Sequence, residues 1–173
     1  MRILIFTLFL ATPIFAQSLD PRYEITGSFE GAFGETEFSL TAYNDLEKSQ
    51  STVQLRDAKN LNTISIRTHA IDEEGKPTRR QYATFGIRYS VGSPIYKTEV
   101  SFKDETGIYV AELAFDNQVE LADFQRDGDM ISFSVQTELF PEKRKADGNY
   151  EIDSSRESKT LSGAFTGNLT DVD

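Results

Sequence analysis

Apolar and polar residues alternate with a period of two along most of this 173-residue chain. In the segment 36–42, for example, Phe38, Leu40 and Ala42 alternate with polar side chains. Successive side chains of a β-strand point to opposite faces, so this pattern predicts half-buried strands, whereas the period of an amphipathic helix is nearly absent. We therefore predict an all-β fold, either a single antiparallel β-sandwich or a closed β-barrel of about eight to ten strands. The expected strands are residues 25–31, 36–42, 53–55, 64–70, 83–91, 96–102, 108–115, 118–125, 130–139 and 160–169.

The first sixteen residues have the pattern of a secretory signal peptide. A basic start at Met1–Arg2 precedes an almost wholly apolar stretch, residues 3–15, and the small residue Ala16 precedes a polar run. The stretch is shorter than the roughly 20 apolar residues that a membrane-spanning helix needs, and no later run is longer. We expect cleavage after Ala16 and export to the periplasm or the cell exterior, with residues 17–173 forming one all-β domain without a transmembrane helix.

Composition excludes several classes of function. Loss of residues 1–16 removes Arg2 and changes the formal net charge from −10 to −11. Nucleic-acid phosphates are bound by clustered Lys and Arg, so we expect no nucleic-acid partner. The sequence has no cysteine, which excludes disulfides, thiol catalysis and cysteine-ligated zinc. A short leader on an acidic, cysteine-free chain indicates a bacterial exported protein.

Two segments near the ends of the domain share the pattern aliphatic-x-Gly-x-Phe-x-Gly. The first is Ile25–Gly31 and the second is Leu161–Gly167. Two glycines on one face of a strand indicate that another backbone or a large ring comes close there. We predict that the first and last strands are neighbours in a closed barrel or tight sandwich, with Phe29 and Phe165 lying across small residues of the adjacent strand. Chance repetition of a short pattern is the alternative.

The fifth and sixth expected strands form a hairpin whose register follows from their apolar residues. Pairing Phe85 with Phe102 across a four-residue loop places every large apolar residue of the hairpin on one face. The other face then sets Arg88 opposite Glu99, which is a favourable cross-strand pair.

Turn chemistry predicts three further features of the second half of the chain. Asp127-Gly128 predicts a two-residue hairpin turn. The alternation slips just before this turn, which predicts a β-bulge near Ala122-Asp123. Residues 141–158 are charged and nearly devoid of core residues, so we expect a long exposed loop there.

A basic segment lies within this acidic chain. Residues 76–103 carry a formal charge of +5, so the rest of residues 17–173 carries −16. A basic strand face with an aromatic ring suits an anionic glycan, a lipid phosphate or an acidic partner protein. The alternative is an ordinary solvated face whose cations pair with acidic neighbours such as Glu99. The candidate ligand-binding residues on this face are Arg80, Tyr82, Arg88, Lys97 and Lys103.

Candidates for catalysis and metal binding are weak. His69 is the only histidine and occupies a polar position of its strand, so we expect it to face solvent rather than to act in a catalytic triad. The oxygen-rich segments 127–129 and 147–153 lack the ligand spacing of an EF-hand. We predict no catalytic residue, no metal site and no cofactor.

Three kinds of function are compatible with these observations. The first is an exported, non-enzymatic binding or interaction protein that holds an anionic or amphipathic ligand, either on the basic face or inside a barrel lined by some of the 13 Phe and 7 Tyr residues. The second is a small outer-membrane β-barrel, although no clear outward apolar band is present. The third is a hydrolase with paired carboxylates, although nothing in the sequence selects a pair. The sequence favours the first.

Overall fold

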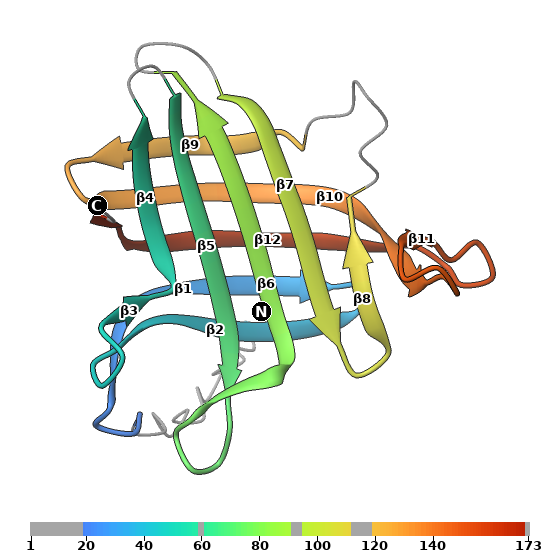
Figure 1. Cartoon of the computed structure of the whole chain (residues 1–173), viewed down its shortest axis with the longest axis horizontal. Helices are drawn as coiled ribbons and strands as arrows, with labels where there is room; N and C mark the ends of the chain where they lie inside the picture. The colour runs from blue at the N-terminus through green and yellow to red at the C-terminus, as the bar shows by residue number, and fades with distance from the viewer. Residues whose placement is uncertain (1–18, 59–60, 91–94, 112–118, 172–173) are drawn as a thin grey trace, which may run out of the picture.

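The alternating segments form strands that join into one closed sheet. A computed structural model describes residues 19–58, 61–90, 95–111 and 119–171. Eight of the strands in these residues, β1, β2, β5, β6, β7, β8, β10 and β12, form an antiparallel barrel that the β2–β5 pair Thr41–His69 closes (Figure 1). The strands are β1 (Tyr23–Phe33), β2 (Thr36–Asp45), β3 (Gln50–Ser51), β4 (Val53–Ala58), β5 (Leu61–Ile71), β6 (Pro77–Tyr89), β7 (Ile95–Asp104), β8 (Gly107–Val110), β9 (Leu121–Asp127), β10 (Met130–Arg144), β11 (Tyr150–Ile152), β12 (Lys159–Asn168) and β13 (Thr170–Asp171). The all-β prediction is confirmed.

Aromatic rings fill the interior of the barrel. In Figure 1 strands β4–β7 cross in front of β1, β2, β9, β10 and β12, and the core lies between these two layers. The Phe85 ring contacts those of Phe29 and Phe133, with centroid separations of 5.0 and 5.1 Å, and all three side chains are at most 2% exposed. Protein interiors packed in this way are about as dense as crystals of small organic molecules. The barrel interior is therefore a packed core.

The first and last long strands are neighbours, as the shared glycine pattern predicts. Strands β1 and β12 pair antiparallel, with Phe29 opposite Phe165 and Gly31 opposite Gly163. A Cβ atom on Gly163 would lie 2.7 Å from the Phe29 ring and 2.6 Å from the Glu30 carbonyl oxygen. The glycines therefore make room for the rings and for the close approach of the two backbones. The prediction that the Phe rings lie across small residues is confirmed.

Alternation along residues 25–31 predicts that Ile25 shares the inward face of Phe29, and this prediction is wrong. A register shift between Ile25 and Gly27 interrupts the β1–β2 ladder. A bulge places one extra residue in the strand and so reverses the side-chain alternation beyond it. As a result Ile25 is 62% exposed and Thr26 is buried instead.

The register predicted for the β6–β7 hairpin is wrong by two residues. Phe85 is paired with Val100 rather than with Phe102, and Arg88 is opposite Lys97 rather than Glu99. A shift of two residues leaves every side chain on the same face, so the apolar alternation cannot separate these two registers. The connecting residues 91–94 lie outside the described residues.

The β9–β10 hairpin has the predicted bulge. The ladder shifts between Ser132 and Ser134, where two residues of β9 face one of β10, and Asp123 has a positive φ of 54°. The turn lies one residue later than predicted, because Asp127 pairs with Met130 and Gly128 takes the first turn position, with φ 58°. Of the expected strand 108–115, residues 112–115 lie outside the described residues.

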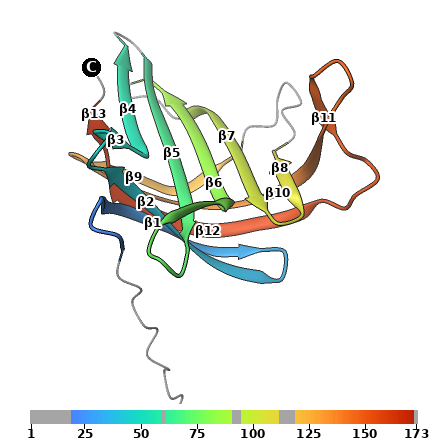
Figure 2. The ribbon, with the colours of Figure 1, turned by 60° about the horizontal axis from the view of Figure 1, so that its bottom comes forward.

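The segment 141–158 is largely exposed, as expected, but it is not simply a loop. Strand β10 continues beyond the barrel to Arg144, and its end pairs with β11 in a hairpin that projects from the barrel (Figure 2). Cross-strand ion pairs hold this hairpin, including Lys145–Glu151 at 3.0 Å and Lys143–Glu151 at 3.5 Å. A solvated hairpin needs no apolar alternation, which explains why the sequence pattern missed it.

Candidate functional site

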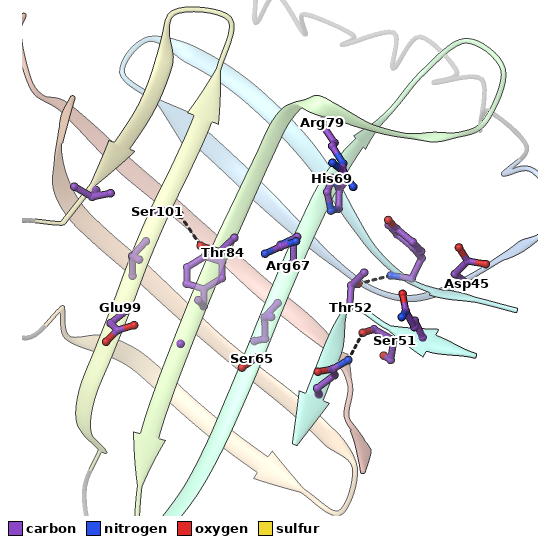
Figure 3. A pocket seen from close by; sticks show the side chains of 18 of the residues that line it. Asp45, Ser51, Thr52, Ser65, Arg67, His69, Arg79, Thr84, Glu99 and Ser101 are labelled. Atoms are coloured by element: carbon purple, nitrogen blue, oxygen red, sulfur yellow. Dashed lines mark hydrogen bonds between the residues drawn. The ribbon is translucent and has the colours of Figure 1, made fainter. Parts of the chain in front are cut away.

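An open groove lies on the outer face of strands β4–β8. Its volume is about 780 Å³ (Figure 3). The strand registers bring outward side chains into rows across this face. Ser65, Gly86 and Glu99 form one row, and Arg67, Thr84 and Ser101 form the next. Four of the six are Gly, Ser or Thr, so the centre of the face is low between larger side chains. The groove therefore forms because the side chains at the centre of this continuous sheet are small.

Hydroxyl groups line the groove. The Thr84 and Ser101 hydroxyl oxygens lie 2.5 Å apart, and the Thr52 hydroxyl accepts a hydrogen bond from the Tyr43 backbone N–H at 2.8 Å. The Ser65 side chain is exposed at the centre of the face. A hydroxyl has one donor and two acceptor sites, so these groups keep hydrogen-bonding capacity for a polar ligand.

Three nitrogen-bearing side chains meet at one end of the groove. Figure 3 shows Arg67, His69 and Arg79 grouped together on β5 and β6. Strand β6 changes register against β5 after His69, and His69 Nδ1 lies 2.8 Å from the Thr78 carbonyl oxygen. This hydrogen bond holds the beginning of β6 against β5, so Arg79 lines the groove next to His69. The group contains two permanent positive charges.

Among the residues that the structure describes, neither Arg67 nor Arg79 has an acidic partner. In the described ranges, no ion pair or side-chain hydrogen bond involves the guanidinium of Arg67 or Arg79. The groove also contains two carboxylates, Asp45 and Glu99, which Figure 3 shows toward opposite sides. Each carboxylate already has a cationic partner, so the uncompensated charge of the groove is positive.

Asp45 and Glu99 are each paired with basic side chains. Arg22 donates from Nε and Nη2 to the two oxygens of Asp45 at 3.0 and 2.7 Å. This bidentate bond holds the pKa of the Asp45 carboxyl below its ordinary value, against the opposing effect of burial. Glu99 Oε1 forms an ion pair with Lys97 Nζ at 2.7 Å and a longer one with Arg88 Nη2 at 3.6 Å.

Burial changes the acidity of the two ring side chains in the groove. The His69 ring lies 5.7 Å from Tyr43 and 5.8 Å from Tyr82, measured between centroids, and the residue is 7% exposed. Burial lowers the pKa of His69 and raises the pKa of Tyr43, because it disfavours the charged form of each. Both rings are therefore neutral near pH 7, and the expectation that His69 faces solvent is wrong.

The five side chains predicted from the basic segment do not form one cluster. Tyr82 and Lys103 are paired at one end of the face, with the Lys103 Nζ 5.7 Å from the Tyr82 ring centroid. Arg88 and Lys97 are paired six residues further along β6, where both contact Glu99. Arg80 is exposed near the start of β6. The groove lies between the two pairs.

Sequence reasoning missed the residues that supply the free charge of the groove. Arg79 lies inside the basic segment but was not assigned to the face, because the β5–β6 irregularity reverses its expected side. Arg67 lies outside the segment and reaches the groove only because β5 pairs with β6. A signal for Arg67 was present, since it occupies an outward position of an alternating strand.

Across residues 19–58, 61–90, 95–111 and 119–171, no three His, Asp or Glu side chains are grouped so that they could hold a metal ion. Within the same ranges, no helix has the length and apolar character needed to cross a membrane.

Comparison of the chain with protein-family models, curated proteins and solved structures yields no match. The site is a polar, hydroxyl-lined and positively charged groove on the outside of a packed β-barrel, and its chemistry indicates what it can bind.

Proposed function

We propose that this chain is an exported, non-enzymatic binding protein that holds an anionic ligand in the outer groove. The observation that carries the proposal is the pair Arg67 and Arg79, two guanidinium groups that line a groove of about 780 Å³ without a carboxylate partner among the described residues. Hydrogen bonds between ionised groups are shorter and stronger than neutral ones. An anionic group placed between the two arginines would gain such bonds without breaking existing ion pairs.

The distribution of apolar residues supports a binding site on the outer face of the barrel. It does not favour a ligand inside the barrel or an outer-membrane β-barrel. The interior is occupied by rings such as Phe29, Phe85 and Phe165, which supports a ligand outside the barrel rather than within it. Outer-membrane barrels carry an apolar band outside and polar residues inside, and the described strands have the reverse arrangement.

The chemistry of the groove supports binding over hydrolysis. Glycoside hydrolases need one carboxyl group with a raised pKa as general acid. The groove carboxylate Asp45 has a lowered pKa and is engaged by Arg22, and Glu99 is engaged by Lys97. Among the described residues, the one hydrogen bond of the His69 ring is to the Thr78 carbonyl, and no hydroxyl is hydrogen-bonded to the ring for activation as a nucleophile.

The export part of the proposal rests on the sequence of residues 1–16, whose basic start, apolar stretch and small final residue match a signal peptide. Export would bring the groove into contact with envelope and extracellular polymers, which include anionic ones. The ligand class would then be an anionic glycan, an anionic lipid headgroup or an acidic protein.

A direct test measures binding of defined anionic probes by titration calorimetry. The probes are a polyuronate, vesicles that contain an anionic phospholipid, and polyglutamate. We expect one of them to bind the wild-type chain and Arg67→Gln/Arg79→Gln to weaken that binding about tenfold or more, because each charge-assisted hydrogen bond contributes about 1.5–3 kcal/mol. The matched control is Arg144→Gln, which removes a charge on the projecting hairpin. Equal binding by the groove variant and the control would refute the proposal.

A further inference from the structure

A second depression adjoins the groove on the same outer face. Its volume is about 430 Å³, and it is lined by Gln54, Arg56, Leu61, Thr63, Ser65 and Arg88. Its two ionisable lining residues are both arginines. Gln54 and Ser65 line the groove as well, so the two depressions share a border.

The border between the two depressions is low. Ser65 is paired with Gly86 at this point of the β5–β6 ladder, and these are the smallest side chains of the row. The Gln54 side chain is drawn toward β3, because its Nε2 donates to the Ser51 carbonyl oxygen at 2.9 Å. The floor is therefore continuous along β5, from Arg67 past Ser65 to Thr63.

Positive charge lies at both ends of this continuous floor. Arg67 and Arg79 lie at one end, and Arg56 and Arg88 flank β5 at the other, where both are paired with Thr63. Thr63 and Arg67 are four residues apart, so the two basic ends are about 13 Å apart at roughly 3.3 Å per residue. A small anion could reach only one end at a time.

The structure already holds one carboxylate at the second basic end. Glu99 forms one ion pair with Lys97 at 2.7 Å and another with Arg88 at 3.6 Å. A Cβ atom on Gly86 would lie 3.5 Å from the nearer Glu99 oxygen, so this carboxylate lies over the low border. An internal carboxylate bound at Arg88 indicates that the site accepts this kind of anion.

We propose that the groove and the second depression form one elongated site for a linear acidic polysaccharide. The chain lies along β5, with one carboxylate or sulfate group at Arg67 and Arg79 and another at Arg56 and Arg88. Hydroxyl groups run along the floor, from Thr84 beside Arg67 past Ser65 to Thr63 beside Arg88, and they match the hydroxyl groups of a sugar chain. This inference rests on the proposed function and deepens it, because it names the ligand class and its minimum length.

The polar character of the floor favours a sugar chain over an acidic peptide or a lipid. Lipid tails need a contiguous apolar surface. A peptide that binds by strand addition needs an open strand edge for its main-chain hydrogen bonds, whereas the floor is the face of three paired strands, β4, β5 and β6.

The test is a length series of oligogalacturonates, from the monomer upward, titrated into the wild-type chain and three variants. Two are Arg67→Gln/Arg79→Gln and Arg56→Gln/Arg88→Gln, which remove one basic end each, and Arg144→Gln is the control. We expect wild-type affinity to rise by about tenfold or more once the oligomer bridges both ends, and then to level off, because a second charge-assisted contact is gained once. Each double variant should abolish this rise, and the control should retain it.

A fourth variant tests the internal carboxylate. Glu99→Gln removes a negative charge from the border and releases Arg88, so long oligomers should bind it more tightly than the wild-type chain. Weaker or unchanged binding by Glu99→Gln would overturn the role of Arg88. Thermal unfolding of each variant checks that the barrel is intact; the exchanged side chains lie on the outer face or, for Arg144, on the projecting hairpin.

The remaining outcomes separate the two proposals. If short and long oligomers bind equally and only Arg67→Gln/Arg79→Gln weakens them, the elongated site is wrong and the anion-binding groove stands. If polyglutamate binds and no oligogalacturonate does, the ligand class is wrong. If no anionic probe binds the wild-type chain, both proposals fail.

Discussion

At the scale of single residues, His69 shows how its surroundings set its protonation state. Burial is the largest influence on its pKa and lowers it from the ordinary 6.5, and the nearby charges of Arg67 and Arg79 lower it further. The hydrogen bond to the Thr78 carbonyl acts in the opposite direction and does not compensate. Burial raises the pKa of Tyr43, which flanks His69, so this ring offers no stabilising negative charge near pH 7. A neutral imidazole with its proton on Nδ1 can donate to Thr78.

This environment predicts a loss of stability in mild acid. Because the folded pKa of His69 is lowered, the unfolded chain binds more protons than the folded chain once the pH falls below about 6.5. The contribution of His69 to stability is therefore complete above pH 6.5 and is lost as the pH falls through the lowered pKa. His69 is the single histidine, so its ring resonances in a tag-free chain report this pKa directly by NMR titration.

The matched variant is His69→Asn, whose side-chain N–H can still donate to Thr78. Urea unfolding at about pH 7.5 and about pH 5 should show a smaller stability difference for this variant than for the wild-type chain. Absolute stability will be lower in the variant because ring contacts are lost, so the difference between the two pH values is the informative quantity. An NMR pKa at or above 6.5 would contradict the interpretation.

The same residue shows what alternation alone can predict. The pattern of residues 64–70 places His69 on the outward face, and this is correct. Outward is not the same as exposed, however, because Tyr43, Tyr82 and the start of β6 cover the ring. These contacts come from other strands, and no local pattern contains them.

At the scale of elements, the pairing of β1 with β12 depends on glycine. A Cβ atom on Gly31 would lie 2.0 Å from the Ser162 carbonyl oxygen, and one on Gly163 would lie 2.6 Å from that of Glu30. We expect Gly31→Ala and Gly163→Ala each to destabilise the barrel by about 1–3 kcal/mol, since backbone atoms must move to relieve the overlap. Urea unfolding of each variant measures this cost.

The control for this prediction is another strand glycine. At Gly86 the nearest atom to an added Cβ is a side-chain oxygen of Glu99, at 3.5 Å, which is ordinary contact. Gly86→Ala should change stability by less than about 1 kcal/mol in either direction. If Gly163→Ala were as mild as Gly86→Ala, the close packing of the first and last strands would be wrong.

Strand existence was more predictable than strand pairing. Alternation locates β2, β5, β6, β7 and β10, because each has one face in the core. Register requires more, since any even shift preserves the faces, and the β6–β7 register was wrong by such a shift. The β1–β12 pairing could be predicted because its glycines and rings fit one another.

At the scale of the whole molecule, the candidate site depends on the order of the strands in the sheet. Arg56, Arg67 and Arg88 come from three strands, and only the β4–β5–β6 order brings them onto one face. Of the five residues that the sequence predicted for a basic face, Arg88 lines the second depression, and Lys97 reaches the groove only through its ion pair with Glu99. The remaining cations could not be assigned without the strand order.

Export of the chain can be tested independently of ligand binding. Residues 1–16 carry a signal-peptide pattern, and the described strands begin at Tyr23, so we expect removal of the leader to leave the barrel strands intact. When the full chain is expressed in a bacterial host, we expect it outside the cytoplasm with an intact mass that begins at Gln17. Detergent-free buffer should retain this product as a β-rich chain that unfolds in one cooperative transition. Leu8→Asp/Leu10→Asp disrupts the apolar stretch and should keep the chain in the cytoplasm at full length. An exported product that still carries residues 1–16, or a wild-type chain that fractionates with this variant, would contradict the leader assignment while leaving the binding site to be judged on its own test.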